Sequence, residues 1–369
     1  MNIAILIRTL EAGGAERAAS SLANAFASAG HAVTILCLTG SGSFYPISSD
    51  VTVRYLNEDS AGGGKRAAFS ALRKRFCALR RFVRTQKPDV LVCMSWSTTL
   101  YGIACTAGVS TLCVGTERAN PYVLDASAAT TFLRRVSAVL CGGFVCQTER
   151  ARTFYPRAAR AKIAVIPNAI FNPLVYDISV PNERTKIVAA CGRLDRNKGF
   201  DVLLDAFAAV HRAYPAYRLC IFGEGACRGE LSAQAQKLGI ADAVDLPGAD
   251  PQAIRTIAQS AVFVLSSRSE GMPNALIEAM AVGVPCVSTR CDMGPEELID
   301  DGVNGLLVPV DDAEAMAQAV MRVLSCAELA DTLGKNALQV RRTHALPAVA
   351  AQWTRYFSDR LGRDLQAKS

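Results

Sequence analysis

Apolar and polar segments follow one another along the chain in the order expected of alternating strands and helices. Short apolar runs predict buried strands, and longer stretches with apolar residues three or four positions apart predict the helices that cover them. The expected strands are residues 2–7, 32–38, 51–56, 90–94, 111–115, 144–146 and 162–166 in the first half, and 187–191, 218–222, 244–246, 261–265 and a strand that begins at Pro285 in the second. Two such arrays in series predict an α/β chain with two Rossmann-like, doubly wound domains and a cleft between the carboxyl ends of their sheets.

The helical stretches and the polar connections between elements predict where the domains begin and end. The expected helices include residues 15–29, 65–85, 99–107, 200–213, 228–238, 251–259 and 348–361. A chain of 369 residues is too long for one ordinary core. We therefore expect an N-terminal domain at 1–168, a C-terminal domain at 169–345 that begins with a polar linker, and a terminal segment at 346–369.

The composition excludes several classes of protein. No apolar run reaches the roughly 18 residues that a membrane span needs, and the apolar strand at the start lacks the basic leader of a signal peptide. The thirteen cysteines are odd in number and form no C-x-x-C pair, which favours a reducing cytosol over a disulfide framework. The sequence also lacks an Asp-x-Asp motif that could clamp a divalent cation on a diphosphate.

Positive charge is concentrated in the first half of the chain. Residues 1–168 hold 20 Lys/Arg against 9 Asp/Glu, or +11, and the remainder holds 20 against 24, or −4, which together give the net charge of +7. Such a division predicts that the first half meets an anionic surface or substrate. Nucleic acid is the rival partner, but the basic region has no interleaved aromatic platform on which bases could stack, so we expect no nucleic-acid binding.

The expected helix at 65–85 concentrates this charge. An apolar stripe along it predicts packing on the first sheet, and its members are Phe69, Leu72, Phe76, Leu79 and Val83. Seven Lys/Arg lie between Arg66 and Arg84 with no Asp or Glu among them. A solvated surface helix is one interpretation. The other is peripheral contact with an anionic membrane, for which the candidate residues are Arg73, Lys74, Arg80 and Arg81.

The stretch 266–289 carries the first candidate site. It leaves an apolar strand through a polar loop that contains Glu270 and Gly271, and it restarts as a helix near Asn274. A loop at the carboxyl end of a strand before a helix N-terminus is where open α/β sheets bind phosphate-bearing ligands. The amides of Ala275 and Leu276 can face an anion there, and Glu278, expected in the first helical turn, suits a ribose diol. Alternatively, Glu278 only complements the helix dipole and Glu270 lies in an ordinary turn.

Two further loops have the same strand-to-helix position. In residues 191–199 the cations Arg193 and Lys198, five positions apart, can converge on one diphosphate, unless they are simply solvated surface charges. Near the N-terminus, Gly13 and Gly14 allow a backbone to approach a ligand closely, unless they only form a tight turn. That loop lacks the third glycine of a dinucleotide fingerprint, which disfavours NAD.

These motifs together resemble those of one enzyme family. Glu270, Gly271, Pro273, Asn274 and Glu278, with Gly283, Pro285 and Val287 behind them, resemble the Glu-seven-Glu signature of the retaining family-4 glycosyltransferases, which have the two-domain GT-B fold. Arg193 and Lys198 are similar to the family's Gly-Arg and Lys-Gly pair, and the Gly13-Gly14-Ala15-Glu16 loop to one that faces the donor diphosphate. Residues 291–297 resemble relatives that use UDP-sugars.

The resemblance implies an N-terminal acceptor-binding domain, a C-terminal nucleotide-sugar-binding domain and a last helix that crosses back to the first domain. It implies retaining, metal-independent transfer, without a cofactor, of a hexose or N-acetylhexosamine from a UDP-sugar to a polyprenyl-diphosphate-linked or lipopolysaccharide glycan at the inner face of the plasma membrane. The implied catalytic residues are Glu270, Arg193 and Lys198, and the implied donor-binding residues add Gly13, Gly14, Gly271, Asn274, Ala275, Leu276 and Glu278.

The loop at 116–121 departs from the family pattern. Family members often carry a His there near the transferred sugar, whereas this chain has Arg118 and Asn120, which are the candidates to replace it. Two other functions stay open: a GT-B-fold sugar-nucleotide 2-epimerase, which would not need a basic acceptor helix, and a nucleotide-sugar-binding module without turnover. A two-carboxylate glycosidase is disfavoured, because Glu278 at a helix N-terminus is poorly suited to protonating a leaving group.

Overall fold

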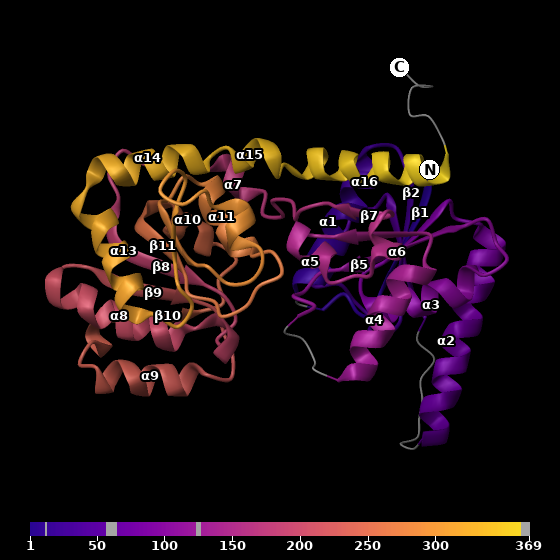
Figure 1. Cartoon of the computed structure of the whole chain (residues 1–369), viewed down its shortest axis with the longest axis horizontal. Coiled ribbons are helices and arrows are strands. Elements are labelled where there is room, and N and C mark those ends of the chain that lie inside the picture. Colours follow the sequence, from indigo (N-terminus) through magenta and orange to yellow (C-terminus); the bar gives the residue numbers. More distant parts are fainter. Residues whose placement is uncertain (12, 57–64, 123–126, 363–369) are drawn as a thin grey trace. The chain divides into compact units, whose positions relative to one another are not determined.

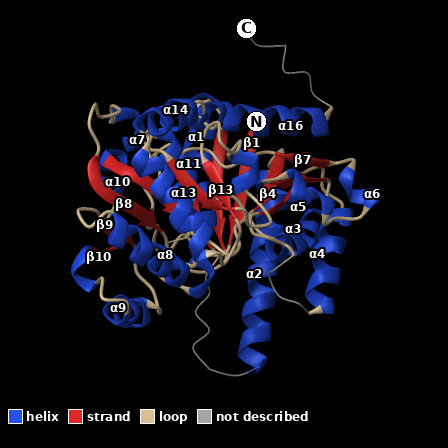
Figure 2. Ribbon diagram, turned by 60° about the vertical axis from the view of Figure 1, so that its left-hand side comes forward, coloured by secondary structure: helices blue, strands red, loops and turns tan. Residues whose placement is uncertain are grey.

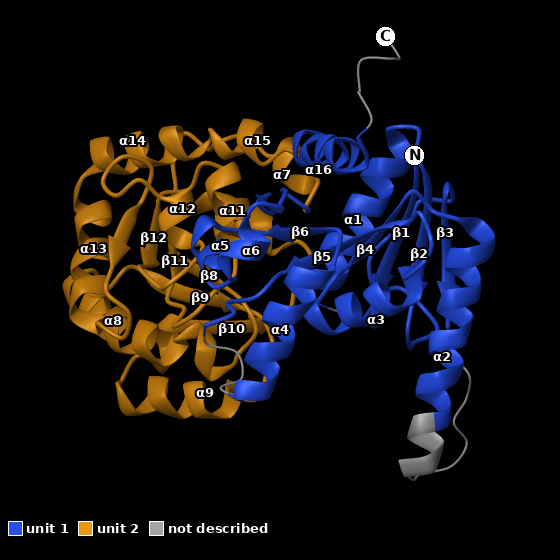
Figure 3. Cartoon of the chain, turned by 45° about the vertical axis from the view of Figure 1, so that its right-hand side comes forward, with its two compact units in different colours: residues 1–171, 346–369 blue, residues 172–345 orange. Residues whose placement is uncertain are grey.

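A computed structural model describes residues 1–11, 13–56, 65–122 and 127–362 of the protein, and from residue 70 onwards the side chains of the helix that begins at Lys65. The chain forms two compact units, one of residues 1–171 together with the segment from Leu346, and the other of residues 172–345 (Figure 3). The expected boundary was at 168/169. Each unit is a parallel sheet covered by helices, so the predicted α/β class with two Rossmann-like, doubly wound domains is confirmed (Figure 2).

The sheet of unit 1 has seven strands in the order β3-β2-β1-β4-β5-β6-β7, all paired in parallel. Most of its strands are nearly continuous apolar runs because helices cover both faces of a parallel sheet. The strands are β1 (Asn2–Ile7), β2 (Ala32–Cys37), β3 (Val51–Tyr55), β4 (Val90–Cys93), β5 (Leu112–Glu117), β6 (Gly143–Cys146) and β7 (Ile163–Val165).

Helices pack on both faces of this sheet (Figure 1). They are α1 (Gly14–Ser28), α2 (Lys65–Gln86), α3 (Trp96–Thr106), α4 (Ala128–Leu140), α5 (Glu149–Thr153), α6 (Arg157–Arg160) and α16 (Leu346–Leu361). Neighbouring residues of a strand point to opposite faces, so Val92 joins the core with α1 and α16, while Cys93 faces α3. At Gly102 of α3 a β-carbon would come within 2.9 Å of the Cys113 Sγ, so glycine permits close helix–sheet packing.

Helix α16 contributes to the core of unit 1. Trp353 and Phe357 are at most 1 % exposed and pack in the same cluster as the α1 residue Phe26. The Tyr356 hydroxyl donates to the Lys162 carbonyl at 2.6 Å and accepts from the Phe144 amide at 2.8 Å. These contacts fix the last helix on unit 1.

Helix α2 forms as expected, but its burial differs from the predicted stripe. Leu79 and Val83 are fully buried and Phe82 joins them, whereas Leu72 is 44 % exposed. The predicted Phe69 and Arg66 side chains lie outside the part of the chain that the structure describes. Only the C-terminal part of α2 therefore packs as the stripe predicts.

The sheet of unit 2 has six parallel strands in the order β10-β9-β8-β11-β12-β13. The strands are β8 (Thr185–Cys191), β9 (Arg218–Phe222), β10 (Val244–Gly248), β11 (Ser260–Leu265), β12 (Cys286–Thr289) and β13 (Leu306–Val308). The helices are α7 (Leu174–Asp177), η1 (Arg196–Lys198), α8 (Phe200–Ala213), α9 (Arg228–Lys237), η2 (Ala241–Ala243), α10 (Ala253–Gln259), α11 (Asn274–Ala281), α12 (Pro295–Leu298), α13 (Ala313–Ser325), α14 (Ala327–Ala337) and α15 (Val340–Thr343).

The strand order of each sheet reverses direction at one point. In unit 1 the chain proceeds from β1 to one side and returns to β4 on the other, and in unit 2 it does the same at β8 and β11. Loops that leave the carboxyl ends of two such strands diverge and leave a crevice in which open α/β sheets bind ligands. The loops after β8 and β11, together with helix α11, contain most of the catalytic and donor-binding residues expected from the sequence.

Candidate functional site

The loops after β8 and β11 are joined by hydrogen bonds at the switch point of unit 2. The Arg268 amide donates to the Asn197 carbonyl at 2.8 Å, and the Asn197 side chain donates to the Ser269 carbonyl at 2.7 Å. The Ser266 hydroxyl donates to the Lys198 carbonyl at 2.8 Å. Residues about seventy positions apart therefore form one polar platform at the carboxyl ends of the two central strands β8 and β11.

Glycine at position 199 allows this close contact. Gly199 has φ +61°, and a β-carbon there would overlap the Ser266 carbonyl oxygen. A side chain is disfavoured by both the backbone conformation and the available space. This glycine therefore positions Lys198, which immediately precedes it.

The platform brings two of the three expected catalytic residues together. Lys198 Nζ lies 2.6 Å from Glu270 Oε1, and their side chains are only 22 % and 11 % exposed. The Ser267 hydroxyl donates to the same carboxylate oxygen at 2.7 Å. Glu270 is thus held in one orientation by a cation and a hydroxyl, and its second oxygen, Oε2, does not take part in either contact.

The third expected catalytic residue, Arg193, has a different environment. Its side chain is 78 % exposed, and its Nε donates to Asp195 Oδ2 at 2.6 Å. The other oxygen of Asp195 accepts from the Lys198 amide at 3.2 Å and caps the short helix η1. Asp195 therefore joins the Arg193 side chain to the Lys198 backbone, while the end of the Arg193 side chain remains accessible to an anion.

Helix α11 begins at Asn274, as expected. Its first intrahelical bond runs from the Ile277 amide to the Pro273 carbonyl at 3.2 Å, so Ala275 and Leu276 belong to the first turn, whose amides have no partner within a helix. The prediction that Glu278 lies in the first turn is wrong. Glu278 is the fifth residue of α11 and lies half-buried in its second turn. The helix dipole acts mainly on charges in the first turn, so the alternative interpretation, in which Glu278 only complements that dipole, does not explain its position.

Ser267, Asp195 and one ion-pair network were not predicted. Arg268 donates to both carboxylate oxygens of Asp201, at 2.9 and 2.7 Å, and its Nε lies 2.7 Å from Asp311. The hydrogen bonds from Arg268 lower the pKa of the Asp201 carboxyl. The role of Asp195 could have been read from its position. It lies three residues before Lys198, which is the spacing between a helix N-cap and the amide that its side chain caps.

The other expected donor residues lie in unit 1. Gly14 is the first residue of α1, and Gly13 precedes it as the N-cap. A β-carbon at Gly13 would overlap the Glu16 carboxylate, so the loop packs tightly against the first turn of the helix. Gly13 and Gly14 are thus at the carboxyl end of β1, the switch point of the first sheet.

The loop after β5 holds the candidate acceptor residues. The Arg118 guanidinium donates to the Asn168 side-chain oxygen, which also accepts from Gln147 at 2.5 Å. Burial lowers the pKa of the Arg118 guanidinium to about 10, so it remains charged at neutral pH. Asn120 is only 3 % exposed and its side-chain oxygen accepts from the Tyr122 amide at 2.9 Å, which indicates a role in the structure of the loop.

The basic helix α2 presents three of its four candidate membrane residues to solvent. Arg73, Lys74 and Arg81 are exposed. Arg80 is a correction to the prediction, because its guanidinium donates to the Cys105 and Ala107 carbonyls at 2.6 and 2.7 Å and so caps the C-terminus of α3. Among the described residues, no helix has the length and apolarity that crossing a bilayer requires.

Comparison with known proteins agrees with this arrangement. Residues 12–170 match the model described as Glycosyltransferase Family 4, and residues 176–340 match Glycosyl transferases group 1. The GalNAc-α-(1->4)-GalNAc-α-(1->3)-diNAcBac-PP-undecaprenol α-1,4-N-acetyl-D-galactosaminyltransferase of Campylobacter jejuni is 30 % identical over 97 % of this chain and 99 % of its own length. The chain belongs to glycosyltransferase family 4.

Solved structures with the same fold align over nearly the whole chain. Sucrose-phosphate synthase from Thermosynechococcus elongatus aligns with a TM-score of 0.81 at 20 % identity, over 98 % of this chain and 99 % of that one. HepE from Anabaena, solved with UDP, aligns with a TM-score of 0.79 at 17 % identity, over 97 % and 100 %. This glycosyltransferase therefore has the GT-B fold, as the resemblance in its motifs predicts.

Proposed function

We propose that this glycosyltransferase transfers a hexose or N-acetylhexosamine, with retention of configuration and without a metal, from a UDP-sugar to a lipid-linked or lipopolysaccharide glycan. The observation that carries the proposal is the Lys198–Glu270 pair, held at the switch point of unit 2 by Ser267. Because the two groups are only 2.6 Å apart, the Lys198 cation can bind the diphosphate of a donor while the Glu270 carboxylate accepts hydrogen bonds from the sugar of the same molecule.

The proposed chemistry is stabilisation of charge on the leaving group. As the bond from the sugar to the diphosphate breaks, the anomeric centre becomes oxocarbenium-like and negative charge grows on the departing phosphate oxygen. Lys198, Arg193 and the first-turn amides of Ala275 and Leu276 would stabilise that charge. Glu270 would orient the hydroxyls of the sugar, with Gly271 and Asn274 beside it, and Glu278 would bind the ribose. In unit 1, Gly13 and Gly14 are the residues that we propose to contact the donor.

The acceptor and the nucleotide are supported by the comparisons. The Campylobacter relative is named for transfer to a diphospho-undecaprenol-linked glycan, and HepE was solved with UDP. A lipid-linked acceptor also agrees with the exposed cations Arg73, Lys74 and Arg81 on α2. In unit 1, Arg118 is the residue we propose to contact the acceptor or the sugar.

The nucleotide is tested by melting curves. A ligand that binds only the native state raises its free energy of unfolding by about 2.7 kcal/mol at a hundredfold excess over Kd. We expect UDP to raise Tm and equal concentrations of GDP and ADP to leave it nearly unchanged. A shift with GDP alone would exclude the UDP assignment while leaving the enzyme class intact. The alternative function, a sugar-nucleotide 2-epimerase, is tested separately: incubation with a UDP-sugar alone would then release its 2-epimer.

A further inference from the structure

Helix α4 has its apolar side towards solvent. Its buried residues are Arg134, Ser137 and Ala138, whereas its large apolar side chains are exposed: Phe132 by 65 %, Leu140 by 62 %, Leu133 by 39 % and Val139 by 38 %. At 100° per residue these four, with Val136, fall within an arc of about 120°. An ordinary surface helix has the reverse arrangement.

The orientation of α4 is fixed by its polar side. Arg134 is 5 % exposed, its Nη1 lies 3.6 Å from the Glu117 carboxylate, and its guanidinium lies over the Trp96 ring at 5.9 Å. Burial raises the pKa of the Glu117 carboxyl, and the charge of Arg134 opposes that rise. Turning the apolar stripe inward would expose this ion pair, so the stripe is a stable feature of the surface.

A second apolar surface lies beside it. Helix α3 lies between α4 and α2 and contacts both (Figures 1 and 3). A groove of about 360 Å³ between α2 and α3 is lined by Leu72, Arg73, Phe76, Leu100, Tyr101 and Ala104. The outer side of this three-helix layer thus carries apolar residues on α2, α3 and α4.

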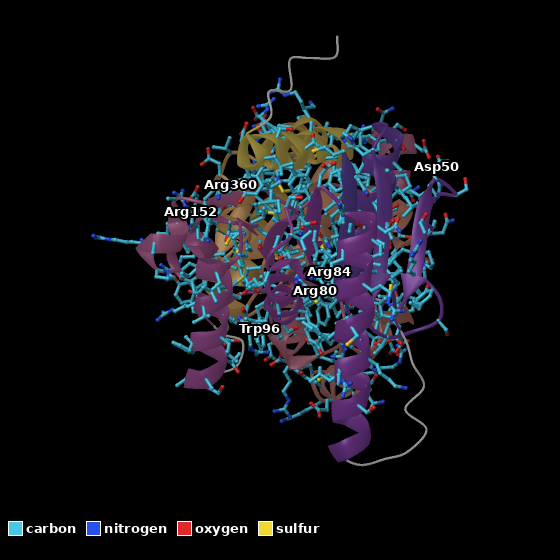
Figure 4. All side chains as sticks on the ribbon, turned by 90° about the vertical axis from the view of Figure 1, so that its right-hand side faces the viewer. Asp50, Arg80, Arg84, Trp96, Arg152 and Arg360 are labelled. Atoms are coloured by element: carbon cyan, nitrogen blue, oxygen red, sulfur yellow. The ribbon has the colours of Figure 1, made fainter. Side chains whose placement is uncertain are left out.

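The charges of the same layer identify its partner. The sequences of α2, α3 and α4 hold ten Lys/Arg, eight in α2 and two in α4, and no Asp or Glu. Arg80 and Arg134 are held inward by the end of α3 and by Glu117, and the exposed cations are Arg73, Lys74, Arg81 and Arg84 of α2 and Arg135 of α4. Figure 4 views the layer from the side of α2, with Arg80 and Arg84 along that helix. A second copy of this face would be repelled by like charge. Apolar side chains among cations are instead complementary to a bilayer with anionic headgroups.

We propose that the apolar stripe of α4, residues Phe132, Leu133, Val136, Val139 and Leu140, inserts into the interface of an anionic lipid bilayer. The cations of α2 bind the headgroups, and the α2–α3 groove receives lipid hydrocarbon. This deepens the proposed function, on which it rests, because a lipid-linked acceptor lies in the same bilayer. Binding through insertion persists at salt concentrations that screen the cations.

The test is flotation of the full chain with vesicles of phosphatidylcholine and phosphatidylglycerol, at low and high salt. We expect the wild type to float in both and Phe132→Gln/Leu140→Gln to partition about a hundredfold less, about tenfold for each apolar side chain removed from the bilayer. Phe44→Gln is the matched control, because Phe44 is 68 % exposed but lies between β2 and β3. Equal binding of the α4 variant and the wild type, or a wild type that stays unbound, would overturn the proposal.

Two further measurements separate the explanations. Phe132→Trp fluorescence should be quenched by brominated lipid more strongly than that of Phe44→Trp, and equal quenching contradicts insertion. Sedimentation that shows a dimer abolished by Phe132→Gln would identify α4 as a protein interface and overturn the proposal. All three α4 variants should keep the Tm shift with UDP and turnover with a water-soluble short-chain acceptor. Absence of turnover in the wild type contradicts the proposed function, while flotation still decides the role of α4.

Discussion

Replacing Lys198 by alanine tests the site through two quantities, the rate of transfer and the free energy of unfolding. We expect turnover to fall roughly 10²- to 10³-fold, the effect of losing one contact that stabilises charge in the transition state. Arg193→Ala should have an effect of the same order, because both cations are proposed to stabilise the same leaving group.

The cost in stability follows from the burial of the pair. Exposed ion pairs contribute about 0.2 to 1 kcal/mol, and breaking a buried pair costs about 3 to 5 kcal/mol. Lys198 and Glu270 are 22 % and 11 % exposed, which is intermediate, so we expect a loss of about 1 to 3 kcal/mol in the free energy of unfolding. That loss lowers Tm by roughly 2 to 10 °C.

The double variant Lys198→Ala/Glu270→Gln separates the two effects. The neutral amide removes the uncompensated charge and can still accept from the Ser267 hydroxyl, so most of the lost Tm should return while turnover stays low. Arg196→Ala is the control, because Arg196 is a cation of the same loop that is 85 % exposed, and it should change neither quantity. Near-normal turnover of Lys198→Ala with every donor would refute the role of this residue.

Three other predictions follow from individual residues. Glu278→Gln should mainly weaken UDP binding, because the ribose is bound in ground and transition states alike, whereas Glu270→Gln should mainly lower kcat; equal losses of UDP affinity would contradict the division. Gly199→Ala should lower the free energy of unfolding by more than the roughly 1 to 3 kcal/mol that backbone strain alone costs. Gly239→Ala is its control, because Gly239 has a similar φ of +70° and no atom within 4 Å of an added β-carbon, so it should show the strain alone. Equal costs of the two variants in urea titrations would argue against the close contact at Ser266. Burial lowers the pKa of His344 to about 4, so the unfolded state binds its proton first and stability should fall as pH drops from about 6.5 towards 4; a His344→Gln variant with an unchanged acid slope would count against this.

The sequence predicts most of the fold because its strands are buried on both faces and stand out as apolar runs. It also identifies the loops after β8 and β11, since a strand, a polar loop and a helix follow one another there. The pairing of Lys198 with Glu270 is not visible in the sequence, because the two are 72 positions apart and meet only through the adjacency of β8 and β11.

Two features of unit 1 show the same limit. No element was predicted at residues 128–140, although Ser127 as N-cap and the helical spacing of Phe132, Val136 and Leu140 were available signals. The sequence cannot show that this stripe faces outward, because that depends on the buried contact of Arg134 with Glu117. Likewise, Arg80 belongs to a basic run, and only the fold shows that the end of α3 engages its guanidinium.

The most direct test of the account is the anomeric configuration of the product. The purified enzyme is incubated with a panel of α-linked UDP-hexoses and UDP-N-acetylhexosamines and a short-chain polyprenyl-diphosphate glycan, in the presence of EDTA, and the product is examined by NMR. We predict an α-linked product from at least one UDP-sugar, and roughly 10²- to 10³-fold less of it from Lys198→Ala at the same enzyme concentration and time. A β-linked product would contradict retention, and transfer only from GDP- or ADP-sugars, or only when a divalent metal is restored, would contradict the proposed donor or the metal-independent site.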